Sequence, residues 1–301
     1  MPLRARVTLV AAEQTRLSNG SEEARIVSDA DLAPRGDLLD LARAALRFVG
    51  PPLPQAQISF ESEIPLRSGL AGSTALLVAL LHALLVWRGE RLVGHGLAEQ
   101  ARRLEREDLG IVCGFGDQYM ASFGGLRFLD FRGKAHGSPT ETLRFATVED
   151  LARFVPRLPF VLAFTGVEHS STAVHAPIRA RWLAGERDAV EGYTRVAALG
   201  AEGKRALLEG DWQQLAAAMN ENHAIQRGLG GSGEVNERLI DAALAAGAPA
   251  AKLAGAGHGG TIVALWTEPD AEPLERALRA AGASEIHRPA PVPGVTIDAV
   301  A

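Results

Sequence analysis

The segment from Pro65 to Ala75 reads Pro-Leu-Arg-Ser-Gly-Leu-Ala-Gly-Ser-Thr-Ala and concentrates glycine and hydroxyl residues between two regular elements. Apolar residues alternate through 57–64, which predicts a strand, and residues 74–87 are almost wholly apolar, which predicts a buried helix. Gly69 and Gly72 let the backbone turn and approach a ligand, and the free N–H groups at a helix start favour an anion. The segment therefore predicts a phosphate site.

This segment has two other interpretations. A nucleotide loop of the Walker type is excluded, because it requires a lysine directly before the hydroxyl residue and Gly72 precedes Ser73 here. An ordinary strand-turn-helix junction is the other, since glycine and serine are also common turn residues.

A second candidate feature is a pair of carboxylates, Glu105 and Asp117, separated by a glycine-containing turn. One carboxylate can ligate Mg²⁺ together with phosphate oxygens, while the other orients or deprotonates a hydroxyl nucleophile. Each has a simpler explanation. Glu105 opens the charged run Glu-Arg-Glu-Asp, which is typical of a solvated helix face, and Asp117 has the residue type of a helix N-cap.

A third feature is the glycine-rich segment Lys-Leu-Ala-Gly-Ala-Gly-His-Gly-Gly at 252–260. Gly255, Gly257 and Gly260 have the spacing of a dinucleotide-binding fingerprint, but that motif opens a helix, whereas residues 261–266 are β-branched and apolar. The segment instead predicts a turn between two strands that brings bare backbone close to a ligand. A plain hairpin turn is the alternative.

Hydroxyl and cationic residues gather at 168–181, where Glu-His-Ser-Ser-Thr-Ala-Val-His is followed by Arg179 and Arg181. Such groups can hold a polyol or an anionic substituent, although a surface loop explains them equally well. The histidines have no metal-ligand spacing to other histidines or cysteines, so no site of that kind is predicted.

The pattern of elements predicts an α+β protein with two lobes, 1–150 and 151–301. The front lobe is richer in strands and the back lobe is richer in helices. Expected strands lie at 6–11, 57–64, 126–131, 160–165 and 295–297, with two more flanking the 255–260 turn. Expected helices lie at 37–48, 74–87, 97–106, 176–183, 189–208, 211–226 and 234–246, with one more before the last strand.

Composition narrows the classes of protein. The 301 residues are 47% hydrophobic with a net charge of −5, and they hold no basic run with interleaved aromatic residues, so no nucleic-acid partner is expected. The longest apolar helix is too short for a membrane span and carries His82, and the N-terminus lacks the apolar region of a signal peptide. The single cysteine, Cys113, excludes an internal disulfide. We therefore expect a cytoplasmic protein without a membrane partner.

Taken in order, these segments resemble the GHMP kinase superfamily, named for galactokinase, homoserine kinase, mevalonate kinase and phosphomevalonate kinase. The resemblance rests on residues 65–75, on Glu105 with Gly114 to Gln118, and on Lys252 to Gly260. It implies a ribosomal-protein-S5-like front lobe, a ferredoxin-like back lobe, ATP and Mg²⁺ as cofactors, and a small-molecule sugar substrate. It leaves a homodimer open as the assembly.

The resemblance also implies roles for individual residues. Asp117 is the expected catalytic residue, and Ser73 and Glu105 are the expected Mg²⁺ ligands. The expected substrate-binding residues are Gln118, Ser171, Arg179, Gly257 and His258. The expected ATP-binding residues are Pro65, Gly69, Leu70, Ala71, Gly72, Ser73, Thr74, Gly255, Ala256 and Gly257.

Two branches of the superfamily share features with this chain. Residues 69–75, 109–112 and 174–183 are similar to the glucuronokinase branch, which phosphorylates a uronic acid at its anomeric hydroxyl. Asp117-Gln118, Thr165-Gly166 and residues 170–172 are more similar to kinases that phosphorylate heptose 7-phosphate at C1. Both branches imply an anomeric sugar kinase.

One part of the family pattern is not found. The first motif, which shapes the substrate pocket, should precede the strand at 6–11. We expect either a misassigned start or a shortened form with impaired binding or folding of the front lobe. A GHMP-like binding or regulatory protein without catalysis is therefore the alternative hypothesis.

Overall fold

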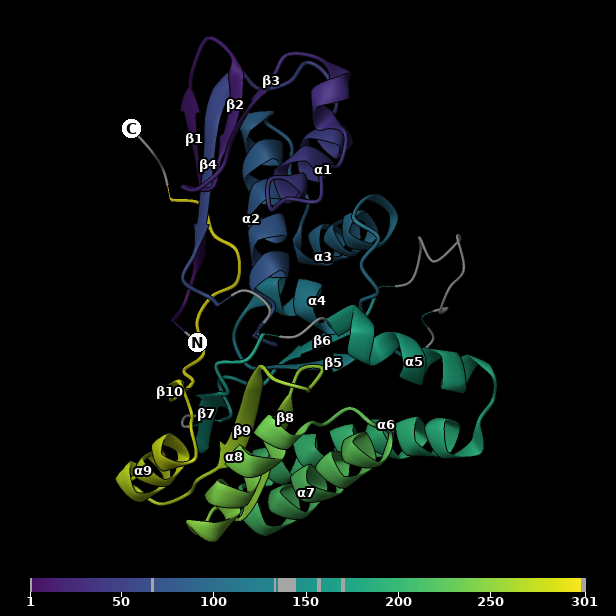
Figure 1. The fold of residues 1–301 in the computed structure, drawn as a ribbon, viewed down its shortest axis with the longest axis vertical. Coiled ribbons are helices and arrows are strands. Elements are labelled where there is room, and N and C mark those ends of the chain that lie inside the picture. The colour runs from purple at the N-terminus through teal and green to yellow at the C-terminus, as the bar shows by residue number, and fades with distance from the viewer. Residues whose placement is uncertain are drawn as a thin grey trace. The chain divides into compact units, whose positions relative to one another are not determined.

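The computed structural model describes residues 2–65, 68–132, 134, 145–155, 158–168 and 171–298. The chain divides into two compact units, which are described separately (Figure 1). The N-terminal unit comprises Leu3–Pro65, Ala71–Asp150 and Val292–Ala301, and the C-terminal unit comprises Met1–Pro2, Leu66–Leu70 and Leu151–Pro291. The glycine and hydroxyl segment at 65–75 is therefore divided, with Gly69 and Leu70 in the C-terminal unit and Ala71 to Thr74 in the N-terminal unit.

The N-terminal unit contains a four-stranded sheet in the order β1-β4-β2-β3. Its strands are β1 (Ala5–Ala11), β2 (Thr15–Ser18), β3 (Glu23–Ile26) and β4 (Ala56–Ser62). Antiparallel pairing joins β1 to β4 and β2 to β3, whereas β2 and β4 run parallel. Ala56, Ile58 and Phe60 of β4 are buried, as expected for alternate residues facing one side of a sheet.

Helices cover one face of this sheet (Figure 1). They include α1 (Asp40–Val49) and the apolar α2 (Gly72–Trp87), followed in the chain by α3 (Gly94–Arg103), a π-helical turn (Leu104–Asp108) and α4 (Gly116–Phe123). A 3₁₀ turn spans Asp29–Leu32, and β5 (Arg127–Asp130) pairs with β6 (Thr147–Asp150). Because α2 is apolar on nearly all sides, it packs as a central helix of its unit.

The C-terminal unit is built on an antiparallel sheet in the order β10-β7-β9-β8. The strands are β7 (Phe160–Phe164), β8 (Ala250–Ala254), β9 (Thr261–Leu265) and β10 (Glu285–His287). Leu239, Ile240, Ile262 and Leu274 belong to its buried core. The helices are α5 (Ser171–Leu183), α6 (Arg187–Glu209), α7 (Trp212–Gly228), α8 (Glu234–Ala245) and α9 (Glu272–Ala280).

The expected strand at 295–297 is wrong. The last strand is β10, and residues 292–295 instead belong to the N-terminal unit, where Pro293 forms a bridge with Gly124 and Val295 N–H donates to Ala121 C=O. Pro293 has no N–H to donate to a ladder, so the β-branched residues that follow it do not extend a sheet. The short strands β2, β3 and β6 were not predicted, because four residues are too few for a clear alternation.

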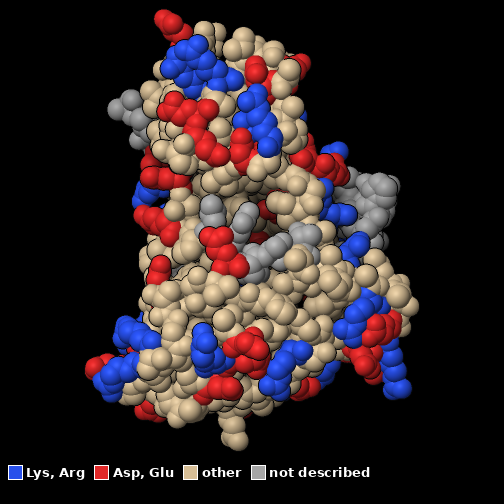
Figure 2. All heavy atoms as spheres, viewed as in Figure 1, with Lys and Arg blue, Asp and Glu red and all other residues tan. Residues whose placement is uncertain are grey.

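None of the helices in the described residues combines the length and apolar composition that a bilayer span requires. On the face shown in Figure 2, acidic and basic side chains of the described residues are interspersed.

Candidate active site

The start of α2 is shaped by two residues with little or no side chain. Ala71, the N-cap, has a left-handed backbone with φ of 60°, and its side chain makes no capping hydrogen bond. Gly72 packs against the preceding strand end, where a Cβ atom would lie 3.1 Å from Ile64 O and 3.3 Å from Pro65 O. The first N–H groups of α2 therefore start from a tightly packed turn, which is the arrangement that favours an anion.

Glu105 is buried in the same unit, and its carboxylate is hydrogen-bonded by the side chains of Thr74, Gln118 and Cys113. Thr74 Oγ1 donates to Glu105 Oε1 at 2.6 Å, and the Gln118 side-chain amide donates to Glu105 Oε2. The Glu105 side chain is 2% exposed, whereas Arg106 and Glu107 next to it are exposed. The interpretation of this run as a solvated helix face thus fails for Glu105 and holds for its two neighbours.

A π-helical turn accounts for the position of Glu105. The predicted helix at 97–106 ends as an α-helix at Arg103, and Glu105 lies in the π-helical turn that follows. Such turns are often found at functional sites because they add a residue and redirect the side chains. Glu105 C=O also accepts from Ile111 N–H at 2.8 Å, which begins the return of the chain toward α4.

The surroundings of Glu105 fit a divalent cation. Burial raises the pKa of this carboxyl, while the hydrogen bonds from Thr74 and Gln118 act in the opposite direction. Gln118 Oε1 is buried and has no hydrogen-bond partner among the described residues. A carboxylate and a hydroxyl are the hard oxygen ligands that Mg²⁺ prefers, and a cation would offset the burial of the negative charge. In the described part of the chain, no three His, Cys, Asp or Glu side chains form a metal cluster, so phosphate oxygens would have to complete the coordination.

Asp117 is the second residue of α4, and Phe115 is the N-cap, so Asp117 is not the cap that its residue type indicated. The preceding turn is held by Arg102, whose Nε donates to Gly114 C=O at 2.9 Å and whose guanidinium carbon lies 3.6 Å from the centre of the Phe115 ring. Desolvation raises the pKa of Asp117. Asp117 also contributes to raising the pKa of Glu105.

Thr74 supplies a hydroxyl that hydrogen-bonds to Glu105, and the expected role of Ser73 as an Mg²⁺ ligand stays a prediction. We expect Thr74→Val to raise the Mg²⁺ concentration for half-maximal activity about tenfold or more, because one charged hydrogen bond is lost. Thr74→Ser keeps the hydroxyl and should stay near wild type. Mn²⁺ binding followed by electron paramagnetic resonance gives a readout independent of turnover. A larger loss of Mn²⁺ affinity in Ser73→Ala than in Thr74→Val would show that Ser73 is the metal-binding hydroxyl.

In the C-terminal unit, two predicted ATP-binding glycines, Gly255 and Gly257, pack through bare backbone against Gly69 and Gly231. A Cβ atom on Gly255 would lie 3.0 Å from Gly69 Cα, and one on Gly257 would lie 1.6 Å from Gly231 O. Thr261 Oγ1 donates to Ser68 C=O at 2.8 Å and fixes the same contact. The turn joins the antiparallel strands β8 and β9, as both interpretations predicted, and at least part of its glycine content serves packing within the unit. The predicted contact of this backbone with a ligand stays a prediction.

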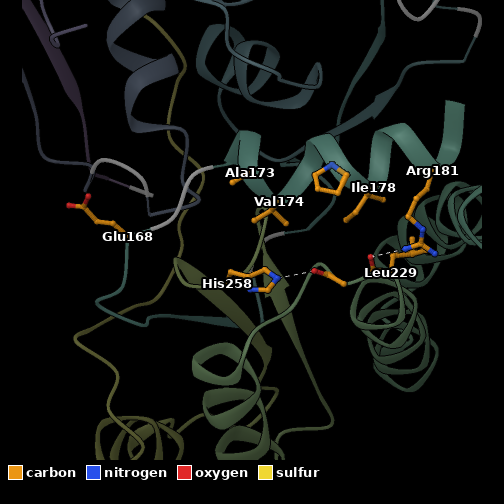
Figure 3. Close-up of a pocket in the computed structure, with 9 residues that line it drawn as sticks. Glu168, Ala173, Val174, Ile178, Arg181, Leu229 and His258 are labelled. Atoms are coloured by element: carbon orange, nitrogen blue, oxygen red, sulfur yellow. Dashed lines mark hydrogen bonds between the residues drawn. The ribbon is translucent and has the colours of Figure 1, made fainter. Parts of the chain in front are cut away.

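A pocket of about 520 Å³ lies between α5, the residues that follow α7 and the turn between β8 and β9 (Figure 3). Its walls are mainly apolar, and three polar side chains also line it. The lining residues are Glu168, Ala173, Val174, Pro177, Ile178, Arg181, Leu229, Gly230 and His258. His258 has a φ of 58°, and its Nε2 lies 2.9 Å from Gly230 O. This backbone region is disfavoured for residues other than glycine, so the His258 side chain is a candidate for a functional role.

The two arginines of α5 differ in their surroundings. Arg181 lines the pocket, but its guanidinium donates to both Glu186 carboxylate oxygens at 2.9 Å and to Leu229 C=O at 3.2 Å. Arg179, the predicted substrate ligand, is exposed and is not among the residues that line the pocket. Ser171 begins α5, and its side chain lies outside the described residues. The substrate roles of Arg179 and Ser171 stay predictions.

Two replacements at His258 separate backbone strain from ligand binding. We expect His258→Gly to be more stable than His258→Ala by about 1 kcal/mol, because only glycine adopts the left-handed backbone without a steric cost. Both variants should raise the KM for the predicted sugar substrate about tenfold if the imidazole contacts it. Thermal unfolding and initial-rate kinetics measure the two effects. An unchanged KM in both variants would remove His258 from the substrate site.

Two α+β units define this protein, one with a helix start beside a buried carboxylate and one with a glycine hairpin. A model of the GHMP kinases N terminal domain matches residues 38–125, and a model of the GHMP kinases C terminal matches residues 204–284. The chain belongs to the GHMP kinase family, and the expected α+β fold is confirmed.

Named relatives agree with this assignment. Glucuronokinase 1 of Arabidopsis thaliana is 31% identical over 75% of this chain and 62% of its own length. D-glycero-alpha-D-manno-heptose 7-phosphate kinase of Campylobacter jejuni is 29% identical over 72% of this chain and 63% of its own. The chain thus spans less than two thirds of either relative. The structure of Lactococcus lactis galactokinase shares the fold, with a TM-score of 0.76, 15% identity and coverage of 98% of this chain and 87% of that chain.

Proposed function

We propose that this protein transfers the γ-phosphate of ATP to a sugar hydroxyl, and that the acceptor is the anomeric C1 hydroxyl of a uronic acid. The observation that carries the proposal is the buried Glu105 carboxylate, held by Thr74 and Gln118 in the unit that also carries the start of α2 and Asp117. A buried acid between polar side chains is costly for stability, and such groups are frequent at functional sites.

In this proposal the residues of the N-terminal unit have different roles. The N–H groups at the start of α2 hold phosphate oxygens, and Thr74 and Glu105 hold Mg²⁺. Bound Mg²⁺ neutralises the charge that develops on the transferred phosphate. Gln118 fixes the Glu105 carboxylate, although the resemblance assigned it to the substrate. Asp117, which is exposed, orients the sugar hydroxyl or accepts its proton.

The choice of a uronic acid rests on the glucuronokinase relative and on the motifs shared with that branch. Heptose 7-phosphate is the second candidate, because a relative named for that activity is almost equally similar. Both acceptors carry an anionic group remote from C1. A protein that binds ligands without turnover is the alternative of a different class.

A coupled assay of ADP release tests the proposal. The protein is incubated with ATP, Mg²⁺ and one sugar at a time from a panel containing glucuronate, galacturonate, heptose 7-phosphate and galactose. We expect sustained release with a uronate. Release only with heptose 7-phosphate would replace the acceptor but keep the reaction. Binding of ATP and sugar without release would establish the non-catalytic alternative.

Arg179 and Arg181 offer a paired test of how a uronate carboxylate is bound. If Arg179 contacts it through its bidentate guanidinium, Arg179→Ala should raise the KM for the uronate about tenfold, with little change for ATP. Arg181→Ala should mainly lower the thermal stability, because this side chain joins α5 to Glu186 and Leu229. An unchanged uronate KM in Arg179→Ala would exclude the contact.

A further inference from the structure

Asn236 is a buried polar residue that no motif singled out. It lies in the first turn of α8 and is 0% exposed. Its side-chain Nδ2 donates to Gly259 C=O at 2.8 Å, and its Oδ1 accepts from Gly259 N–H at 2.8 Å. One amide thereby satisfies both backbone groups of a single residue in the turn between β8 and β9.

The rest of this turn is attached on other sides. Gly260 N–H donates to Val167 C=O at 2.9 Å, and Thr165 N–H donates to Gly260 C=O at 2.8 Å. The residues that follow β7 therefore hold Gly260, the last residue of the turn. Gly255 and Gly257, at the beginning, pack against the backbone of Gly69 and Gly231. Between these anchors, the Asn236 amide supplies two side-chain hydrogen bonds to the turn.

We infer that Asn236 is a positioning residue for nucleotide binding, acting through Gly259 on the backbone of Gly255 to Gly257. This inference rests on the proposed function, because it takes that backbone to contact ATP. The physical reason is that a glycine-rich turn has many accessible conformations. If a ligand binds only one of them, its affinity falls as the population of that conformation falls. A rigid, buried amide selects one conformation before the nucleotide arrives.

Asn236→Asp tests this role with a nearly isosteric change. The carboxylate still accepts from Gly259 N–H, but it cannot donate, so it faces Gly259 C=O with a second acceptor. We expect the Kd for MgADP, measured by calorimetry near pH 8, to rise about tenfold. A buried aspartate gains a proton as the pH falls, and its O–H can then donate to Gly259 C=O. Affinity should therefore recover toward the wild-type value near about pH 6.

Asn220→Asp is the matched control. Asn220 in α7 also donates its amide to a backbone carbonyl, Pro249 C=O at 3.1 Å, but on the surface and away from the turn. The Asn220→Asp protein should bind MgADP with the wild-type affinity at both pH values. His258 and Glu237, titratable neighbours in sequence of Gly259 and Asn236, are unchanged in all three proteins. The wild type measured at each pH therefore corrects for their titration.

Hydrogen exchange adds a readout that does not depend on the folding of a variant. The Gly259 amide of the nucleotide-free protein should be protected far more than amides of exposed turns, because its acceptor is buried. Rapid exchange there would overturn the inference, as would an Asn236→Asp protein that is less heat-stable but binds MgADP like the wild type. A wild type that binds no nucleotide would overturn the proposed function itself, and with it any role of Asn236 in ATP binding.

Discussion

Replacing Asp117 with asparagine is expected to lower sugar-dependent ADP release by about 10²- to 10⁴-fold, the usual contribution of a positioned general base. The amide keeps the size of the side chain and its place in the first turn of α4, but it cannot accept a proton. ATP binding should stay nearly intact, because the proposed contacts with phosphate come from other residues. Steady-state kinetics together with nucleotide titration separate the two quantities.

Asp188 is a matched control for this change. It is the second residue of α6, as Asp117 is of α4, and it is also exposed. Asp188→Asn removes the same favourable interaction of a carboxylate with a helix start, worth about 0.3–1 kcal/mol, and should leave turnover unchanged. If purified Asp117→Asn also turned over at the wild-type rate, the catalytic assignment would be wrong.

Glu105→Gln is expected to reduce turnover by about 10²-fold or more, because the negative charge that would hold Mg²⁺ is lost from a buried site. Thermal stability should not fall and is expected to rise. A neutral amide removes the cost of burying a charge, and its N–H₂ group can donate to Gln118 Oε1 after that side chain flips. Thermal unfolding, Mn²⁺ binding and kinetics on one preparation test all three statements.

Glu107→Gln provides the comparison within the same π-helical turn. Glu107 is exposed and pairs with Arg103 at 2.8 Å, so its neutralisation should cost less than about 1 kcal/mol and leave Mn²⁺ binding unchanged. A Glu105→Gln protein that unfolds at a much lower temperature but retains Mn²⁺ affinity would show that Glu105 is a structural residue.

Local elements were predicted well where one pattern dominated. Alternation through 57–64 and the apolar run through 74–87 correspond to β4 and α2, and the β-branched residues after Gly260 form β9 as expected. Prediction failed where position in space decided the outcome. Val295 and Ile297 have the residue types of a strand, yet Pro293 and the contact with α4 place this segment outside either sheet.

The sequence by itself determined which short segments are candidates for the chemistry and where the chain turns, because periodicity, glycine and proline act over a few residues. Only the tertiary structure decided which side chains meet. Ser73 and Thr74 are equally suitable hydroxyls, but consecutive residues of a helix point about 100° apart, and α2 is too uniformly apolar to reveal which side faces Glu105. Likewise, Arg181 is engaged in hydrogen bonds because the fold brings Glu186 and Leu229 within reach of its guanidinium. Asn236 is hydrogen-bonded to Gly259, which lies 23 positions away in the sequence.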